Sequence, residues 1–291
     1  MSSELVLKLE LEEPSLKAQQ KALQELRETP ENIRKGLKEF KELLEGLTDL
    51  NIPKTDEKWL LTFLRACKFY PESARDLVRR YFNIRQKYSE ITNLLTPLKV
   101  KQVFDANIVS LLPQRDQEGR RIIATHAAGD RWNPKLISLD VIYAASTLCT
   151  ELIQLEPETQ INGVVYIADM KGLGISQALQ YTPSRALRTL NYIQNNIPLR
   201  VKAIHFVNAP KIFEPIFGGV KIFFNEKFAK RILIHSKGFD SLHRYISPEY
   251  LPECYGGTLK MDLLYGPETY KLLLPYQEYF ENFDKYGFKK Y

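Results

Sequence analysis

The sequence predicts an α/β protein in which a small all-helical domain precedes a mixed, mostly parallel β-sheet. Three observations predict this class. Up to about residue 96, apolar residues recur at steps of three and four, which is the period of an amphipathic helix. From about residue 103, short β-branched runs alternate with helical stretches, an order typical of parallel strands joined by helices. The 291 residues are 44% hydrophobic and 26% charged, which supports a globular core and excludes a disordered chain, a collagen and a small disulfide scaffold.

The chain is expected to divide into four parts. They are an N-terminal extension over 1–28, expected to be helical, a helical bundle over 29–96, the sheet domain over 97–258 and a C-terminal extension over 259–291. The first part has no secretory signal pattern, and no stretch approaches the roughly 18 to 20 apolar residues of a membrane span. Three cysteines outside any C-x-x-C spacing give no support for a disulfide framework. We therefore expect a cytoplasmic protein.

Capping residues mark the first helices. Thr29-Pro30 supplies an N-cap and a proline at the first helical position. The chain breaks at Asn51-Ile52-Pro53 and restarts at Thr55-Asp56, and Tyr70-Pro71 begins a further helix. Their apolar stripes predict a small bundle whose solvent side carries basic residues, among them Arg79, Arg80 and Arg85.

The strands follow in the second part. Ser138 and Thr182-Pro183 are expected to begin the helices that separate them. The resulting β-α-β-α-β order favours a largely parallel sheet. The expected strands are 108–112, 121–126, 164–169, 201–207 and 232–234.

Local signatures of common catalytic sites are absent from the sequence. Gly172-Leu173-Gly174 follows a strand, but Gln177 stands where a dinucleotide-binding loop has its third glycine, so a turn is the better interpretation. There is no G-x-S-x-G, Walker or H-E-x-x-H motif, and the four histidines have no metal-ligand spacing. We therefore expect no catalytic residues, no metal and no cofactor.

Positive charge is concentrated in one segment. The chain has a net charge of +6, and the segment from Arg200 to Lys237 carries that whole excess, with eight basic and two acidic residues. Such a segment indicates an anionic partner, which the charge alone leaves open between nucleic acid, an acidic protein and anionic lipid headgroups. Chance clustering on a solvated face is the alternative.

An unusually apolar helix adjoins this segment. Its face has the spacing i, i+3, i+4, i+7 and i+11, and Gly218-Gly219 provides a point where it can bend. One interpretation is a core helix packed on the sheet. The other is an interfacial membrane-binding element, because Lys227 and Lys230-Arg231 follow directly. The residues of the face are Phe213, Ile216, Phe217, Val220 and Phe224.

Six motifs together resemble one protein family. They are DEKWLLTFLRACKF at 56–69, DQEGRR at 116–121, EPETQINGV at 156–164, IPLRVK at 197–202, IHFVN at 204–208 and LPECYGG at 251–257. From roughly residue 30 to 270 the chain resembles the CRAL-TRIO lipid-binding family, and within it the branch of the α-tocopherol transfer protein and the cellular retinaldehyde-binding protein. Cys254 departs from this branch, which usually has an acidic residue there.

The resemblance implies a sheet that floors an apolar cavity, with a mobile gate helix within positions 208–231. Ser146 and Thr150, one helical turn apart, are expected to hold a hydroxyl or an ordered water in this cavity. Ala168, Leu173 and Tyr192 differ from the tocopherol carrier, so the cavity is expected to be reshaped. The implied cavity residues are Tyr143, Ser146, Thr150, Val164, Ala168, Tyr192, Ile193, Ile197, Leu199, Val201, Ile204 and Ile216, and the implied phosphoinositide-binding residues are Arg200, Lys202, Lys227 and Arg231.

The expected function is therefore that of a non-catalytic, monomeric carrier. It would hold a tocopherol, retinoid, carotenoid or similar lipid and exchange it at phosphoinositide-containing membranes, with no nucleic-acid partner. A phosphoinositide-binding trafficking adaptor without diffusible cargo is the alternative, and an enzyme is a third possibility.

Overall fold

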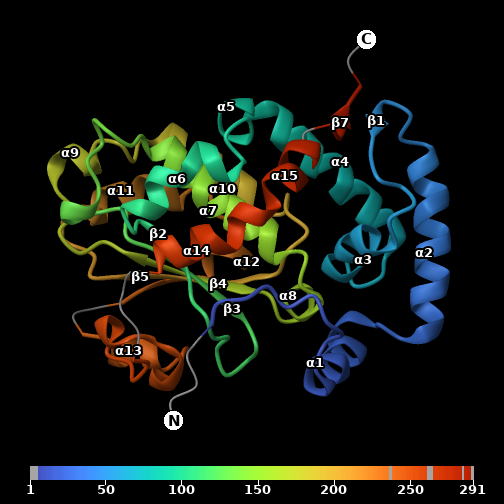
Figure 1. Ribbon diagram of the computed structural model, residues 1–291, viewed down its shortest axis with the longest axis horizontal. Helices are drawn as coiled ribbons and strands as arrows, with labels where there is room; N and C mark the ends of the chain where they lie inside the picture. Colours follow the sequence, from blue (N-terminus) through green and yellow to red (C-terminus); the bar gives the residue numbers. More distant parts are fainter. Residues whose placement is uncertain (1–5, 236–237, 261–264, 284, 290–291) are drawn as a thin grey trace.

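The computed structural model describes residues 6–235, 238–260, 265–283 and 285–289. Lys237, the last cation of the basic segment, lies outside these residues. Two bodies of helices are joined around a central sheet, and Figure 1 shows the N-terminal helices on the right and the sheet with its covering helices on the left. Among the described residues, no helix is both long and apolar enough to cross a membrane.

The N-terminal extension is helical only from Leu16 onward. Residues 6–14 form no helix, α1 (Leu16–Lys21) begins behind the N-cap Ser15, and a π-helical turn, η1 (Ala22–Leu26), continues it. Arg27 then turns the chain with a left-handed φ of 64°.

The helical bundle begins where its capping residues predict. Thr29 caps α2 (Pro30–Glu45), Asp56 caps α3 (Glu57–Ala66), and α4 (Pro71–Lys87) starts with proline. Strand β1 (Leu50–Asn51) pairs antiparallel with β7 (Gly287–Phe288), so the end of the chain returns to the bundle. Buried residues of all three helices make one core, which includes Phe40, Leu44, Leu60, Phe63, Val78 and Tyr81.

The prediction that Arg85 lies on the solvent side is wrong. Its side chain is only 8% exposed, and its Nη1 lies 3.5 Å from Glu151 Oε1. Glu151 belongs to α7 (Leu139–Ile153), on the far side of the bundle interface. Burial of the guanidinium is tolerated because this carboxylate compensates its charge.

The predicted mixed, mostly parallel sheet is confirmed. Its order is β2-β3-β4-β5-β6, with β2 antiparallel to β3 and the other neighbours parallel. The strands lie within one or two residues of the expected ranges: β2 (Val109–Leu111), β3 (Arg121–Thr125), β4 (Val164–Asp169), β5 (Val201–Val207) and β6 (Ile232–Ile234).

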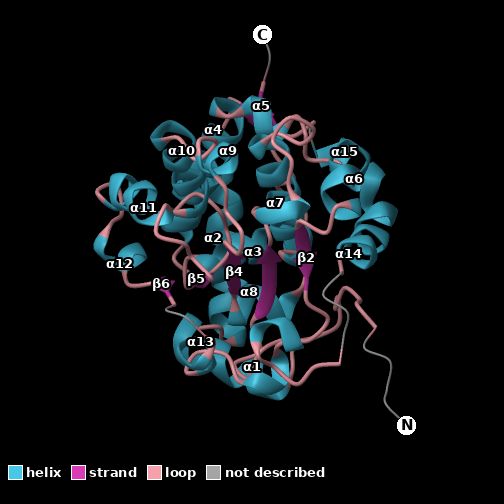
Figure 2. Cartoon of the chain, turned by 90° about the vertical axis from the view of Figure 1, so that its left-hand side faces the viewer, coloured by secondary structure: helices cyan, strands magenta, loops and turns pink. Residues whose placement is uncertain are grey.

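Both faces of the sheet are covered. Alternate residues of a strand point to opposite faces, so Ile123 and Tyr166 join the main core while Ile122 and Val165 pack on the other side. Figure 1 shows α7 and α10 (Pro183–Ile193) above the sheet and α13 (Asp240–His243) below it, and Figure 2 shows the same arrangement from the side. Four further helices pack on the main-core side: α5 (Ser89–Thr92), α6 (Pro97–Asp105), α14 (Gly266–Leu273) and α15 (Gln277–Phe283).

Short elements complete the fold. Helix α8 (Pro157–Asn162) precedes β4, α9 (Ile175–Ala178) follows it, and α11 (Phe213–Lys221) and α12 (Glu226–Ala229) connect β5 to β6. The single turns of 3-10 helix are η2 (Gly129–Arg131), η3 (Pro248–Tyr250), η4 (Glu253–Tyr255) and η5 (Leu274–Tyr276).

Candidate ligand cavity and its lid

An apolar cavity of about 210 Å³ lies between the sheet and three helices. Tyr166 and Ala168 of β4 and Ile204 and Phe206 of β5 contribute its floor. The two β5 side chains face the same way because they are two residues apart in a strand. The walls come from α7 and α10, with Ile142, Tyr143, Ser146, Ala186, Thr189, Leu190 and Ile193.

Helix α11 forms the lid of this cavity. The predicted apolar face Phe213, Ile216, Phe217, Val220 and Phe224 lines the cavity as a set. Ring centroids 5.0 Å apart join Phe206 of the floor to Phe213, and Phe213 and Phe217 are 5.8 Å apart. The lid is therefore held against the floor by side-chain packing.

The lid helix is shorter than the spacing predicts. It ends at Lys221, and Phe224 lies in the turn that follows. The reason is a new cap, because the Asn225 side chain accepts a hydrogen bond from the Phe228 amide and begins α12. Phe224 reaches the cavity from this turn, where its ring packs 5.7 Å from Phe217.

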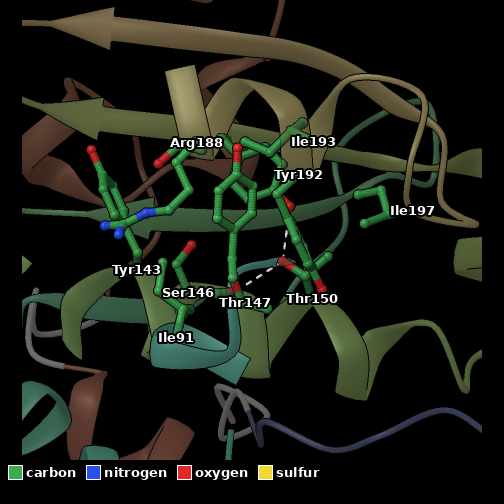
Figure 3. A pocket seen from close by; sticks show the side chains of 12 residues that line it. Ile91, Tyr143, Ser146, Thr147, Thr150, Arg188, Tyr192, Ile193 and Ile197 are labelled. Carbon is green, nitrogen blue, oxygen red and sulfur yellow. Dashed lines mark hydrogen bonds between the residues drawn. The ribbon is translucent and has the colours of Figure 1, made fainter. Parts of the chain in front are cut away.

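A smaller pocket of about 50 Å³ adjoins the cavity and shares Tyr143, Ser146, Tyr166, Thr189 and Ile193 with it. Figure 3 shows Ser146 and Thr150 entering this pocket from α7, with Tyr192 and Ile193 across from them. Hydroxyl groups thus gather at one end of an otherwise apolar interior.

The two hydroxyls that the sequence paired have different roles. Thr150 Oγ1 donates to the Ser146 carbonyl oxygen at 2.8 Å and lies 2.8 Å from the Tyr166 hydroxyl. Among the described residues, none forms a hydrogen bond with the Ser146 hydroxyl, and Ser146 lines both cavities. Ser146 is therefore the hydroxyl that is available to a ligand.

The larger cavity is lined by uncharged side chains. Among the described residues that line the two spaces, none is a carboxylate, a histidine or a cysteine, and Arg188 is the one charged side chain. Arg188 is held by ion pairs with Glu90 and Asp140. Burial raises the pKa of Tyr143 to about 12, so its phenol stays protonated at neutral pH.

Most of the implied cavity residues line one of the two spaces. Val164, Leu199 and Val201 do not, and this part of the expectation is corrected. They are buried in the main core together with Leu148 and Leu152 of α7, because side chains fill the space at the amino ends of β4 and β5. The residues that do line the spaces are Tyr143, Ser146, Thr150, Ala168, Tyr192, Ile193, Ile197, Ile204 and Ile216.

The sequence analysis does not predict several of the residues that line the cavity. Phe206 lies two residues after Ile204 in β5, so the alternation of side chains along a strand could have predicted that it faces the cavity. Ala186, Thr189 and Leu190 share the helical face of Ile193, at steps of three and four. Tyr88 and Ile91, in contrast, come from the preceding helical part, and no local pattern links them to a distant cavity.

Three of the four implied phosphoinositide-binding residues lie together. Arg200 and Lys202 stand just before and within β5, and Arg231 just before β6, whose Ile232 pairs with Ile204. Burial, and after it the charge of Arg200, lowers the pKa of both Lys202 and Arg231. Lys227 lies exposed on α12, and no described interaction joins it to the other three.

Exposed apolar side chains surround the outside of the lid. Ile222 is 77% exposed and Phe223 42%, directly after α11, while Ile175 and Leu179 at α9 are about as open, at 71% and 70%. Ala178 of α9 and Phe213 of α11 belong to one buried cluster. The exposed lysines near these side chains in the sequence are Lys171, Lys211, Lys221 and Lys227.

Comparison of the sequence with known families identifies one family. The sequence model of the CRAL/TRIO domain matches residues 105–257. The human protein named α-tocopherol transfer protein-like is 34% identical over 238 residues, which are 82% of this chain and 69% of that protein. Human clavesin-2 is 33% identical over 242 residues, 82% of this chain and 73% of its own. The crystal structure of Sfh5 aligns with a TM-score of 0.44 at 15% identity, covering 93% of this chain and 99% of that one.

Proposed function

Because the chain belongs to the CRAL/TRIO family, we propose that it carries a hydrophobic small molecule in the cavity under α11 and exchanges it at phosphoinositide-containing membranes. One observation carries this proposal: the lid presents its apolar face to an apolar, neutral cavity. The name of the human relative favours a tocopherol-like lipid among the candidates. A retinoid or a carotenoid has the same general chemistry.

The physical reason for a lid is the cost of moving such a ligand through water. A ligand with about twenty buried carbons gains roughly 16 kcal/mol at about 0.8 kcal/mol for each CH₂. Release into water is therefore too slow to be useful. An opened α11 would offer the ligand an apolar path along Phe213 and Phe217 into a bilayer.

The outer surface of the lid supports docking on an anionic membrane. Ile222 and Phe223 are exposed apolar side chains, and Lys221 and Lys227 flank them. A basic residue near an anionic bilayer contributes about 1 kcal/mol, and a buried aliphatic side chain about 1.5 to 3 kcal/mol. Together they support reversible binding.

Extraction of the purified protein with organic solvent, followed by mass spectrometry, tests the cargo. We expect about one apolar molecule for each chain. If the protein binds vesicles but yields no such molecule, the adaptor without diffusible cargo is the better account. Conversion of the bound molecule over time would instead indicate an enzyme.

Vesicle binding tests the docking surface. Ile222→Ser should weaken binding to vesicles that contain phosphatidylinositol 4,5-bisphosphate by about tenfold, because an inserted aliphatic side chain is lost. Leu98→Ser is the matched control, since Leu98 is 59% exposed on α6, on the opposite side of the molecule from α11 in Figure 2. Equal effects of the two changes would contradict this orientation.

A further inference from the structure

A carboxylate of the N-terminal segment already occupies the basic cluster at β5. Glu25 Oε2 lies 2.5 Å from Arg200 Nη2 and 3.9 Å from Lys202 Nζ. Glu25 belongs to the π-helical turn Ala22–Leu26, which is separated from Arg200 by 175 positions in the sequence. This contact therefore exists only when the N-terminal segment is docked on the sheet domain.

The docked segment has a small interface. Figure 1 shows α1 directly below α8, where Ala18, Ala22 and Leu26 form a cluster with Ile161. Two alanines and one leucine bury little apolar area, and polar contacts supply much of the rest. Ser15 donates through its hydroxyl to Glu158 at 3.1 Å, and Lys21 pairs with Glu118 at 3.9 Å.

The site around Glu25 keeps an excess of positive charge. Arg200 and Lys202 contact the Glu25 carboxylate, Arg231 lies close enough to Arg200 for the two charges to interact, and among the described residues no carboxylate pairs with Arg231. Burial, reinforced by the charge of Arg200, lowers the pKa of Lys202 to about 8, although Glu25 opposes the shift. Burial raises the pKa of Glu25, but the hydrogen bond from Arg200 and the nearby cations outweigh it, so the net pKa is lowered.

A phosphomonoester would satisfy this site better than one carboxylate does. It carries a charge of about −1.5 to −2 at neutral pH and three acceptor oxygens. Arg200 Nη1 already donates to the Ile161 carbonyl oxygen at 2.6 Å, so Arg200 offers the phosphate its Nη2, and Lys202 and Arg231 offer further charged donors. The carboxylate and the phosphate compete for the same donors.

We propose that Glu25 is an internal competitor for the phosphate site, so that a phosphomonoester binds Arg200, Lys202 and Arg231 by displacing Glu25 and releasing Leu16–Leu26 from α8. This inference rests on the proposed function, because it assigns a regulation to the same basic site. The N-terminal segment then acts as a latch that weakens binding to membranes without the phosphorylated headgroup.

The test replaces Glu25 with an uncharged residue of the same size. Glu25→Gln should bind soluble inositol 1,4,5-trisphosphate about two- to fivefold more tightly than the wild type in calorimetry, the range expected for a partly exposed ion pair. Glu226→Gln is the control, since it makes the same change in net charge and Glu226 pairs only with Lys230 among the described residues. Equal gains in the two variants, or no gain in Glu25→Gln, would overturn the inference.

Hydrogen exchange of the wild type tests the displacement itself. Adding inositol 1,4,5-trisphosphate should accelerate amide exchange in 16–26 and leave exchange in α2 unchanged. Binding without faster exchange would mean that phosphate and Glu25 share the site, and the displacement would be refuted.

Further arms separate this inference from the proposed function. Lys202→Ala with Arg231→Ala should abolish headgroup binding, and thermal unfolding checks that the variant is folded. If the wild type binds phosphoinositide vesicles through these residues and Glu25→Gln changes nothing, the latch fails and the carrier function stands. If inositol trisphosphate binds with the predicted Glu25 effect but vesicles do not bind, the result supports the latch for a soluble phosphate ligand. It contradicts the proposed exchange at membranes. If neither probe binds, both the latch and the phosphoinositide part of the function fail.

Discussion

Ser146 and Thr150 show how two similar hydroxyls on one helix face acquire different tasks. Thr150 is held between the Ser146 carbonyl and the Tyr166 hydroxyl, so it supports the cavity wall. Ser146 faces both cavities. The sequence predicts that the pair faces inward, but only the neighbouring Tyr166 decides which member is already engaged.

We expect Ser146→Ala to weaken the binding of a hydroxyl-bearing hydrophobic ligand by up to about tenfold, because one hydrogen bond of about 0.5 to 1.5 kcal/mol is lost. Fluorescence titration with this ligand and with its hydroxyl-free analogue measures the effect. The analogue should bind both proteins equally. A similar loss for both ligands would show that Ser146 acts through packing instead.

The buried histidine pair predicts a dependence of stability on pH. His205 Nδ1 lies 2.9 Å from His235 Nε2, and His235 Nδ1 lies 2.9 Å from the Ser241 hydroxyl. Burial and the charge of His235 lower the pKa of His205 to about 3, and burial lowers the pKa of His235. The unfolded chain therefore binds more protons than the folded one between about pH 6.5 and pH 3.

Stability should be fully present above pH 6.5 and fall as the pH drops toward 3. The free energy of unfolding in urea should decrease by about 2 kcal/mol between pH 7 and pH 5 from His205 alone. His205→Gln should flatten this part of the profile. A profile of unchanged slope in the variant would assign the dependence to other groups.

At the scale of elements, the lid helix contains two glycines that lower its stability. Gly218 and Gly219 lie in α11, both are exposed, and a Cβ added to either would meet no atom within 4 Å. Packing therefore does not require glycine here. Glycine lowers helix stability by about 1 kcal/mol relative to alanine, so the pair makes α11 easier to bend or unwind.

Replacing both glycines with alanine should stabilise α11 and slow the transfer of ligand between vesicles, because opening the lid becomes harder. Stopped-flow transfer of a fluorescent ligand measures the rate. The affinity for the ligand at equilibrium serves as the control and should not fall. Unchanged or faster transfer in the double variant would contradict a lid that bends at this point.

The strand–helix junction before β4 depends on another glycine. Gly163 has a φ of +88°, and a Cβ there would lie 2.1 Å from the Arg200 carbonyl oxygen. The backbones of α8 and β5 therefore approach more closely than any side chain allows. This contact places Arg200, and with it the basic cluster, beside the N-terminal segment.

At the scale of the whole molecule, contacts between distant segments join the bundle to the sheet domain. The Tyr81 and Tyr192 hydroxyls both donate to Glu151, at 2.8 and 2.5 Å, so α4, α7 and α10 share one buried carboxylate. Arg65 of α3 pairs with Glu28 at 2.6 Å and donates to Gln160 of α8. The C-terminal Phe283 packs on the bundle core.

These connections predict that the two parts unfold together. Trp59 lies in the bundle and Trp132 in the core of the sheet domain, and the chain has no other tryptophan. Single-tryptophan proteins made by Trp59→Phe and Trp132→Phe should show the same urea midpoint for the fluorescence change and for circular dichroism. Two separate midpoints would show that the bundle and the sheet domain are independent units.

Much of this architecture is predictable because its signals are local. Caps at Thr29, Asp56 and Ser138 fix where helices begin, and β-branched runs fix the strands. The apolar face of the lid could also be predicted from the sequence, since helical spacing depends only on neighbours in the chain. The burial of Arg85 and the filled space at Val164 could not be predicted from the sequence, because each depends on how α7 packs against another element.

By itself, the sequence determined the order of helices and strands, the family and the apolar lid next to a basic segment, since periodicity, caps and motifs are properties of short stretches. Only the tertiary structure decided which side chains border an empty space, which hydroxyl is engaged and that Glu25 occupies the basic cluster. Those features arise where separate elements come into contact, across 16 positions for Thr150 and Tyr166 and 175 for Glu25 and Arg200, and no local pattern encodes such contacts.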